Sequence, residues 1–203
     1  QASSSGTWGD IDQDGFLDLL VAQANLAFSN PSTNVLYRNN GDNTFSKVST
    51  NAIVQVLGKC DSGTVGDFNN DGFIDLFIAN HFGVDSLFRN EGAGLFTRLT
   101  PAECGPPVSD NDKSFDATWV DYDCDGFLDL FTVNGDYSLS KCLYRNRGDG
   151  IFLRMSAGQA GSIATDPVVA WGCCWADFDA DGYPDVWLPN SNGRQLLYRN
   201  VGD

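Results

Sequence analysis

The chain contains few basic residues, and this shortage limits the partners that it can bind. Its 203 residues include 12 Lys and Arg against 27 Asp and Glu, which leaves a formal net charge of −15. Nothing in this composition offsets repulsion from phosphate groups, so we expect no nucleic-acid partner. Long apolar runs are absent too. Because no stretch approaches the ~20 residues of a membrane-spanning helix, we expect no membrane span.

Signatures of secretion and catalysis are scarce as well. No basic segment is followed by an apolar one, so we expect that any signal peptide has been removed or lies outside this sequence. The sole histidine, His81, has no nucleophile motif, phosphate-binding loop or His-Glu-x-x-His motif beside it. Paired Asp residues can hydrolyse glycosides without His, but the Asp residues here are better explained as metal ligands, so we expect no enzyme.

Asp is abundant, and most of it lies in four copies of one nine-residue cluster. Of the 27 acidic residues, 25 are Asp, and 15 of these lie in the clusters. The copies read Asp-x-Asp-x-Asp-Gly-x-x-Asp, with Asn69 at one third position, and occupy residues 10–18, 67–75, 121–129 and 177–185. Their first residues are 57, 54 and 56 positions apart, a spacing typical of a repeat protein.

The spacing of the oxygen-bearing side chains predicts a Ca²⁺ site in each cluster, up to four in all. Positions 1, 3, 5 and 9 offer hard oxygen ligands, position 6 is the Gly of a tight turn, and position 7 would offer its backbone carbonyl. Position 12 of an EF-hand is Glu, but here it is Val21, Ile78, Thr132 or Leu188, so these are not EF-hands. The predicted metal-ligating residues are Asp10, Asp12, Asp14, Phe16, Asp18, Asp67, Asn69, Asp71, Phe73, Asp75, Asp121, Asp123, Asp125, Phe127, Asp129, Asp177, Asp179, Asp181, Tyr183 and Asp185.

Each cluster lies within a predicted set of short β-strands. A strand precedes it (7–8, 64–65, 118–119 and 174–175), and a second follows it (16–21, 73–79, 127–133 and 183–188). A third contains Leu-Tyr/Phe-Arg-Asn, and after a Gly turn a fourth begins at Phe45, Phe96 or Phe152. Four antiparallel strands per repeat predict an all-β fold, a β-propeller with calcium loops. Residues 1–203 then form one propeller region with repeats near 5–50, 60–100, 115–156 and 171–203.

Several side chains have expected places in such a propeller. Trp8, Trp119, Trp175 and Trp187 recur at strand positions, so we expect them to pack between blades. The repeated Arg38, Arg89, Arg145 and Arg199 lie at the metal-loop end of the third strand, where they can offset carboxylate charge. The fourth repeat stops before its fourth strand, so we expect either a fragment of a longer propeller or an open unit that self-assembles through its blade edge. A closed four-bladed ring is the third alternative, and it fits these ends worst.

The cysteines favour an oxidising compartment. Six thiols allow 15 pairings, and we favour a disulfide between Cys60 and Cys104. Cys173 and Cys174 are adjacent, so they would pair with separate partners, of which Cys124 and Cys142 are available. The alternative is six buried free thiols.

The repeats resemble the FG-GAP or VCBS-type repeats of integrin α-subunit propellers, and most closely the cartilage-acidic-protein and UnbV-like group. Residues 7–19 with 34–45, and 119–130 with 143–152, match that pattern, whereas Val65 replaces the Trp in repeat two. The resemblance implies Ca²⁺ in the Asp loops and a secreted or cell-surface protein for adhesion, ligand binding or scaffolding. A carbohydrate-binding propeller is the main alternative, and a region of a secreted hydrolase is a weaker one.

The loops at the end of the blades opposite the metal clusters vary between repeats, and variable loops on a rigid scaffold are where ligands usually bind. They predict a surface that binds a protein or glycan of unknown identity. Its residues would be His81, Phe82, Lys113, Tyr137, Trp171 and Arg194. An ordinary solvated surface is the alternative interpretation of these loops.

Overall fold

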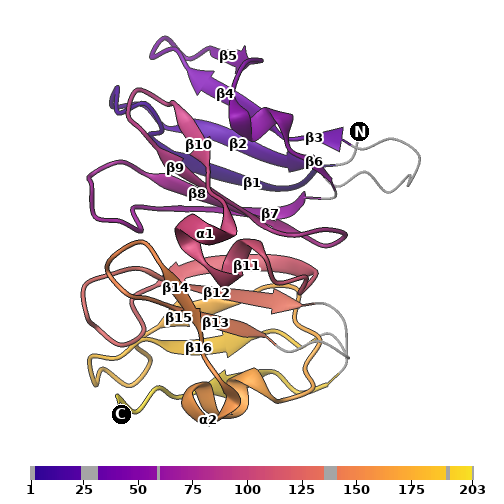
Figure 1. The fold of residues 1–203 in the computed structure, drawn as a ribbon, viewed down its shortest axis with the longest axis vertical. Coiled ribbons are helices and arrows are strands. Elements are labelled where there is room, and N and C mark those ends of the chain that lie inside the picture. Colours follow the sequence, from indigo (N-terminus) through magenta and orange to yellow (C-terminus); the bar gives the residue numbers. More distant parts are fainter. Residues whose placement is uncertain (1–2, 24–31, 59, 135–140, 191–192, 203) are drawn as a thin grey trace.

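The computed structural model describes residues 3–23, 32–58, 60–134, 141–190 and 193–202, which form four antiparallel sheets stacked along the long axis of the molecule (Figure 1). Blade one contains β1 (Ser3–Gly9), β2 (Asp18–Gln23), β4 (Val35–Asn39) and β5 (Phe45–Val48). Blade two contains β7 (Cys60–Gly66), β8 (Asp75–Asn80), β9 (Ser86–Asn90) and β10 (Phe96–Arg98). Blade three contains β11 (Ser114–Val120), β12 (Asp129–Asn134), β13 (Cys142–Asn146) and β14 (Phe152–Arg154). Blade four contains β15 (Cys174–Ala176), β16 (Asp185–Leu188) and β17 (Leu196–Tyr198).

Short elements connect the blades. β3 (Ser32–Thr33) pairs with β6 (Leu57–Gly58), and η1 (Ala52–Gln55) precedes β6. The turns α1 (Pro101–Cys104) and η2 (Pro106–Val108) lie between blades two and three, and α2 (Ala157–Ala160) and η3 (Gly161–Ala164) follow blade three. Among the described residues, no helix is long and apolar enough to cross a membrane.

The blades have the predicted meander topology, which confirms the all-β propeller. In blades one to three the four strands pair in chain order, and each metal loop joins the first strand to the second. The first strand carries a bulge at the same place in each of these blades, between Ser3 and Ser5, Cys60 and Ser62, and Ser114 and Asp116. The predicted second strands begin two residues too early, because positions 7 and 8 still belong to the loop.

The hydrophobic core is divided into three parts, one at each junction between neighbouring blades. The first strands β1, β7 and β11 contact one another in sequence, and the sheets pack face to face around them. Leu20 and Leu76 meet between blades one and two, Phe77 and Leu130 between blades two and three, and Phe131 with Val186 between blades three and four. Each blade is therefore stabilised by its neighbours rather than by a core of its own.

The Trp prediction holds for only two of the four side chains. Trp119 and Trp175 are partly buried and pack against the inter-blade cores. Trp8 and Trp187 are exposed, because they occupy the outer faces of the first and last blades, where the described chain provides no neighbour.

The disulfide prediction is wrong in this structure, in which all six cysteines are free thiols. Cys60 and Cys104 are both buried, but Cys60 lies in the core between blades one and two and Cys104 in the core between blades two and three. Of the remaining four thiols, Cys142 donates to Asp112, Cys124 donates to the Gly182 carbonyl, Cys173 packs in the last core, and Cys174 is exposed. Burial raises the pKa of the Cys60 thiol to about 11, which keeps it protonated and unreactive.

Candidate metal centres

The four Asp clusters adopt one loop conformation, which the backbone hydrogen bonds repeat at the same positions. The carboxylate at position 1 accepts the N–H groups of positions 5 and 6, as when Asp10 accepts from Asp14 at 3.0 Å and Gly15 at 3.0 Å. Position 5 accepts from position 7, where Asp14 accepts the Phe16 N–H at 3.0 Å. The Gly at position 6 has φ between 89° and 96° in all four loops, a conformation that other residues rarely adopt.

The Asp at position 9 is the anchor of each loop to its blade. Asp129 is fully buried, accepts the Tyr122 N–H at 3.2 Å within the loop, and accepts the Asn146 N–H at 2.7 Å from the third strand. Asp18, Asp75 and Asp185 make the corresponding pairs of bonds. Sequence reasoning assigned position 9 to the metal alone, but the structure shows that it also fixes the hairpin.

In three loops the carboxylates converge closely enough to hold a cation. One oxygen from each of three side chains lies within 4.8 Å of the others in the groups Asp10–Asp12–Asp14, Asp121–Asp123–Asp129 and Asp177–Asp179–Asp185. Hard oxygen donors in such groups suit Ca²⁺. Together they bring at least three negative charges into one turn, which a divalent cation would partly neutralise.

Two unpartnered oxygens support a cation in loops one and three. Asp12 Oδ1 and Asp123 Oδ1 are buried and accept no hydrogen bond from the described residues. The other oxygens of these carboxylates face arginines, at 2.6 Å from Arg38 Nε and 2.6 Å from Arg145 Nε. Burial of a carboxylate oxygen without a partner is energetically costly. Asp12 Oδ1 and Asp123 Oδ1, the inner oxygens of these loops, are therefore natural ligands for a metal ion.

The expected charge compensation by the repeated arginines holds in three repeats. Arg38 pairs with Asp12 and Asp14, Arg145 with Asp123 and Asp125, and Arg199 with Asp179 and Asp181. Arg89 pairs instead with Glu91, at 2.7 Å. Loop two has Asn69 at position 3, which provides no carboxylate for Arg89.

Loop two also differs in its internal contacts. The Asn69 amide donates to Asp71 Oδ2 at 2.8 Å and its oxygen accepts the Asp71 N–H at 3.1 Å. Its side chain is therefore held by Asp71. The remaining acids Asp67, Asp71 and Asp75 do not form a convergent group like those of the other loops. This geometry agrees with the prediction that loop two binds Ca²⁺ most weakly.

Burial and crowding alter the acidity of the anchoring carboxylates. Desolvation, together with the charges of Asp123 and Asp125, raises the pKa of Asp129 to about 7, although backbone hydrogen bonds from Asn146 and Tyr122 act to lower it. The pKa of Asp75 is raised to about 7 for the same reasons, with Asp71 and Asp67 as its neighbours. A divalent cation nearby favours the charged form of such a group, so its binding would release protons near neutral pH.

The aromatic residue at position 7 has a second role, in packing. Phe127 lies directly over Gly148 in the turn between the third and fourth strands, where an added Cβ would stand 2.8 Å from its ring. The other loops repeat this contact, with Phe16 over Gly41, Phe73 over Gly92 and Tyr183 over Gly202. The ring therefore packs against the Gly turn, and larger turn residues would displace it.

The Asn at or just after the end of the third strand joins neighbouring blades in blades two, three and four, a function that sequence reasoning missed. Asn90 donates to Ile11 O at 2.8 Å, and Asn146 donates to Phe68 O at 2.7 Å. Asn200 donates to Tyr122 O at 2.7 Å. In each case the acceptor is position 2 of the metal loop in the preceding blade. The identical Leu-Tyr/Phe-Arg-Asn segments were the available signal.

A second set of contacts connects the metal loops in order. The position-4 side chain of one loop donates to the position-6 carbonyl of the next: Gln13 to Gly72, Asn70 to Gly126 at 3.0 Å, and Cys124 to Gly182 at 3.4 Å. Position 4 has φ between 56° and 60° in every loop, which aims its side chain along the row. The four loops thus form a continuous hydrogen-bonded rim at one end of the blades.

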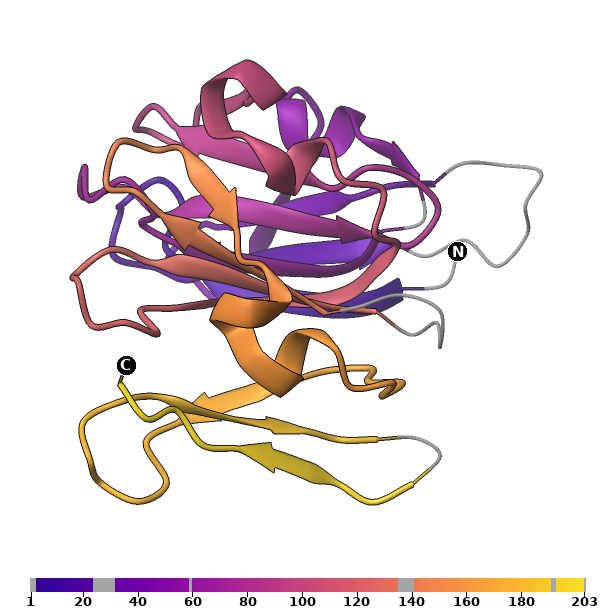
Figure 2. The same ribbon diagram turned by 60° about the horizontal axis from the view of Figure 1, so that its bottom comes forward.

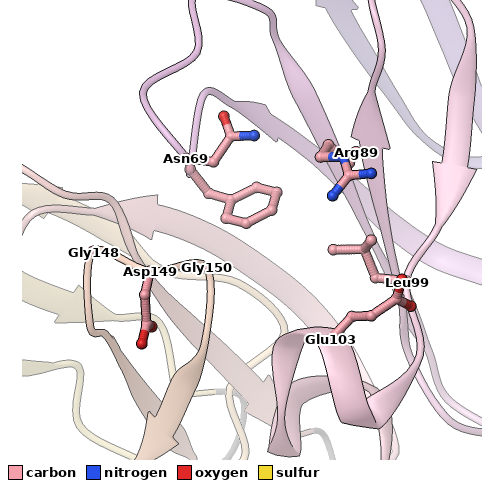
Figure 3. A pocket seen from close by; sticks show the side chains of 8 residues that line it. Asn69, Arg89, Leu99, Glu103, Gly148, Asp149 and Gly150 are labelled. Atoms are coloured by element: carbon pink, nitrogen blue, oxygen red, sulfur yellow. The ribbon is translucent and has the colours of Figure 1, made fainter.

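A pocket lies beside loop two, between blades two and three (Figure 3). Its volume is about 330 Å³, and its lining includes Arg89 and the acids Glu103 and Asp149. Among the described residues that the sequence predicts to bind metal or ligand, only Asn69 lines this pocket. The pocket is polar, and its charges are of both signs.

The predicted ligand surface is partly assembled. The rings of Phe82 and His81 lie 4.4 Å apart, His81 and Phe115 3.9 Å, and Phe115 and Trp171 4.8 Å. These four rings form an aromatic row that crosses from blade two to the segment before blade four, and its end members Phe82 and Trp171 are exposed. Phe115 was missed, because it lies inside a predicted inter-blade loop.

The other predicted ligand residues do not join this row. Lys113 and Arg194 are exposed, and no contact places either of them at the aromatic row. Tyr137 lies outside the described residues. The structure therefore reduces the predicted surface to three of its six residues, with Phe115 added.

Comparison with known proteins identifies the repeats. Residues 10–78 and 67–132 match the FG-GAP-like repeat family, and together they include more than half of the chain. No curated protein matches the chain. Among solved structures, a lectin from Agrocybe aegerita, described as specifically recognising non-reducing terminal N-acetylglucosamine, has a similar fold, with 17% sequence identity and a TM-score of 0.53.

The lectin similarity includes 97% of this chain but 52% of the lectin, so the chain spans about half of the lectin's length. At this identity the similarity concerns the fold alone, and it agrees with the stacked four-stranded blades described above. The matched segments contain the first three of the Asp clusters whose loop conformation repeats in all four blades. On these grounds the chain belongs to the FG-GAP-like repeat family.

Proposed function

We propose that this chain is a non-enzymatic, calcium-binding propeller module that works outside the cell in adhesion, ligand binding or scaffolding. The observation that carries the proposal is the convergence of carboxylates in loops one, three and four, together with the unpartnered inner oxygens of Asp12 and Asp123. The family match supports it, because the matched segments contain the first three loops.

In this proposal calcium is structural. The ion would neutralise the crowded carboxylates, and each loop is joined to its neighbour through position 4 and through the Asn of the next blade. Binding would therefore stiffen a rim that runs through all four blades. An extracellular location suits such sites, since calcium is abundant there and many extracellular modules bind it weakly.

A calcium titration of the wild type and an Asn69→Asp variant tests the proposal. We expect up to four sites by calorimetry, of which loop two is the weakest. Asn69→Asp adds a fourth carboxylate that Arg89 can reach, as its counterparts do in the other repeats, so it should tighten the weakest site about tenfold. An Asn40→Asp variant, which places the same charge in a turn outside the loops, should leave the affinities unchanged.

Two results would count against this proposal. One is the absence of calcium binding by the folded wild type at millimolar calcium. The other is a weakest site that does not respond to Asn69→Asp, which would place that site in another loop.

Glycan binding is a second candidate function, and the aromatic row favours it. Exposed rings such as Phe82 and Trp171 can stack against the apolar C–H face of a sugar. The row lies where blades meet, and aromatic side chains converging between blades are what a carbohydrate-binding propeller requires. The lectin of similar fold adds a reason to test sugars, including N-acetylglucosamine.

A glycan array probed with the calcium-loaded protein tests this candidate. We expect that Trp171→Ala lowers binding of any glycan hit about tenfold, because one stacking contact of an aromatic ring is lost. Trp8→Ala is the matched control, since Trp8 is equally exposed but lies on blade one, and it should bind as the wild type does. Glycan hits that resist Trp171→Ala would rule out the aromatic row as the site.

A further inference from the structure

We propose that a pocket between blade three and the turns that follow it binds a small anion, a carboxylate or sulfate group carried on a body about the size of one sugar. The proposal rests on the ligand-binding part of the proposed function, for which it names a ligand class. It does not depend on calcium, because the pocket lies at the end of the blades opposite the metal loops and none of their residues lines it. Two cationic side chains line it, Lys141 and Arg154.

The pocket lies where the connection from blade three to blade four crosses the edge of blade three. Figure 2 shows this connection as the orange coils between blade three and the yellow strands of blade four. The volume of the pocket is about 290 Å³, at the lower limit for small-molecule sites, so it suits a ligand about as large as one sugar. Its lining combines the two cations with apolar groups and a hydroxyl, and it includes Lys141, Arg154, Met155, Ala157, Ala164 and Thr165.

Lys141 departs from the structural role that its position has in the other blades. In blades one, two and four, the side chain of the residue immediately before the third strand accepts a backbone N–H from the end of the second strand. These donor and acceptor pairs are Gln23 with Asn34 at 3.4 Å, Asn80 with Asp85 at 2.7 Å, and Asn190 with Gln195 at 3.0 Å. An ammonium group cannot accept a hydrogen bond, so the repeat does not account for a Lys at this position in blade three.

The charge of Lys141 is buried and incompletely paired. The residue is 1% exposed, and its Nζ donates to the Asp166 carbonyl at 2.6 Å, its one hydrogen bond to the described part of the chain. An ammonium group has three N–H donors, so two remain for a ligand. Because Asp166 follows Thr165, which lines the pocket, the ammonium group lies near that wall.

The environment of Lys141 favours an anion beside it. Desolvation lowers the pKa of Lys141, and the charge of Asp166 acts in the opposite direction. The Asp166 carboxylate itself accepts the Tyr198 hydroxyl at 2.9 Å. A bound oxyanion would offset the cost of burying the ammonium group, provided that it also accepts the remaining N–H donors.

Arg154 adds hydrogen-bond donors to the same pocket. Its Nη1 contacts Asp110 Oδ2 at 2.8 Å and Asp112 Oδ2 at 3.1 Å. All of its hydrogen bonds to described residues go through Nη1, so Nε and Nη2 can donate to an oxyanion. Since two acids already balance the charge of Arg154, Lys141 supplies the attraction and Arg154 supplies directional hydrogen bonds.

Amide NMR of the calcium-loaded protein, titrated with sodium glucuronate, sodium sulfate or glucose, tests the proposal. We expect glucuronate to bind with a dissociation constant of about 1 mM and to shift the amide signals of Ala157 and Thr165. Glucose should cause no shift there, because it offers no charge to Lys141. Binding of sulfate as well would assign recognition to the oxyanion alone, whereas binding of glucuronate without sulfate would show that the sugar body contributes.

Charge-removing variants separate the site from the fold. Lys141→Gln removes the charge but keeps an amide N–H that can donate to the Asp166 carbonyl, so it should weaken glucuronate binding at least about tenfold. Lys47→Gln is the matched control, because it removes an exposed Lys of blade one and changes the net charge equally, and it should bind as the wild type does. Ala157→Leu, which fills part of the pocket without a change of charge, replaces Lys141→Gln if the latter fails to fold.

Several outcomes would overturn the proposal. One is that neither glucuronate nor sulfate shifts these amide signals at about 10 mM. Others are glucuronate binding that Lys141→Gln leaves unchanged, equal binding of glucose, or shifts confined to the metal loops, which would mean that anions reach bound calcium instead. Calcium binding is measured in the same samples, so a failure of the anion site and a failure of the calcium function are separate results.

Discussion

Removal of calcium is expected to lower the melting temperature of this protein by about 10 °C or more. A ligand at a hundred times its dissociation constant stabilises the folded state by about 2.7 kcal/mol per site. Each kcal/mol shifts the melting temperature of a chain of this size by about 2–4 °C, so two occupied sites already account for the shift. The measurement is thermal unfolding with calcium and then with chelator.

Two variants connect this effect to the loops. Asp123→Asn removes a carboxylate that has a buried, unpartnered oxygen, so it should reduce the calcium-dependent shift. Asp42→Asn changes an Asp in an exposed turn outside the loops and should leave the shift intact. Equal melting temperatures with calcium and with chelator would mean that the sites are empty or do not contribute to stability.

Replacement of Asn146 by Ala should be the most damaging substitution at a polar residue of the described blades. Asn146 is fully buried, donates to Phe68 O and Leu128 O at 2.7 and 3.0 Å, and accepts the Gly148 N–H at 3.0 Å. The variant removes the Asn146 hydrogen bonds from the buried Phe68 carbonyl, from the part-buried Leu128 carbonyl and from the Gly148 N–H. Each such loss costs about 1–3 kcal/mol, so we expect the free energy of unfolding to fall by about 3 kcal/mol.

Asn39 provides the matched control for this experiment. It occupies the same position in blade one, but donates within its own blade, to Leu17 O at 3.2 Å, and is partly exposed. Asn39→Ala should therefore cost about 1 kcal/mol. Urea unfolding at saturating calcium measures both variants. If the two cost the same, the inter-blade hydrogen bond does not stabilise the junction as argued here.

Much of the fold could be predicted from the sequence because the same local pattern of Asp and Gly residues occurs in four repeats. Gly15, Gly72, Gly126 and Gly182 recur with the same spacing around carboxylates, and this pattern alone fixes the turn and its flanking strands. The fourth strands begin at Phe45, Phe96 and Phe152, as predicted, because each follows a Gly turn. Local patterns of this kind can be recognised in the sequence without information on how the blades pack.

Contacts between blades were the part that local patterns did not reveal. Asn90 and Asn146 looked like strand ends, yet they donate to a loop 79 and 78 residues earlier in the chain. The same limit explains the Cys60 and Cys104 error, since spacing along the chain does not indicate which core a thiol enters. It also explains why Phe115, which was predicted to lie in an inter-blade loop but belongs to β11, was not assigned to the aromatic row.

The hydrogen-bonded rim at the metal end has a consequence for how such a protein can change over evolution. Substitutions in the rim are constrained in two ways. Each loop must keep its own turn conformation, and it must also keep its hydrogen bond to the neighbouring loop, such as the bond from Asn70 to the Gly126 carbonyl. The aromatic row lies on segments that take no part in the rim. New specificities can therefore arise at that row by exchange of a few rings, while the architecture that supports them is inherited unchanged.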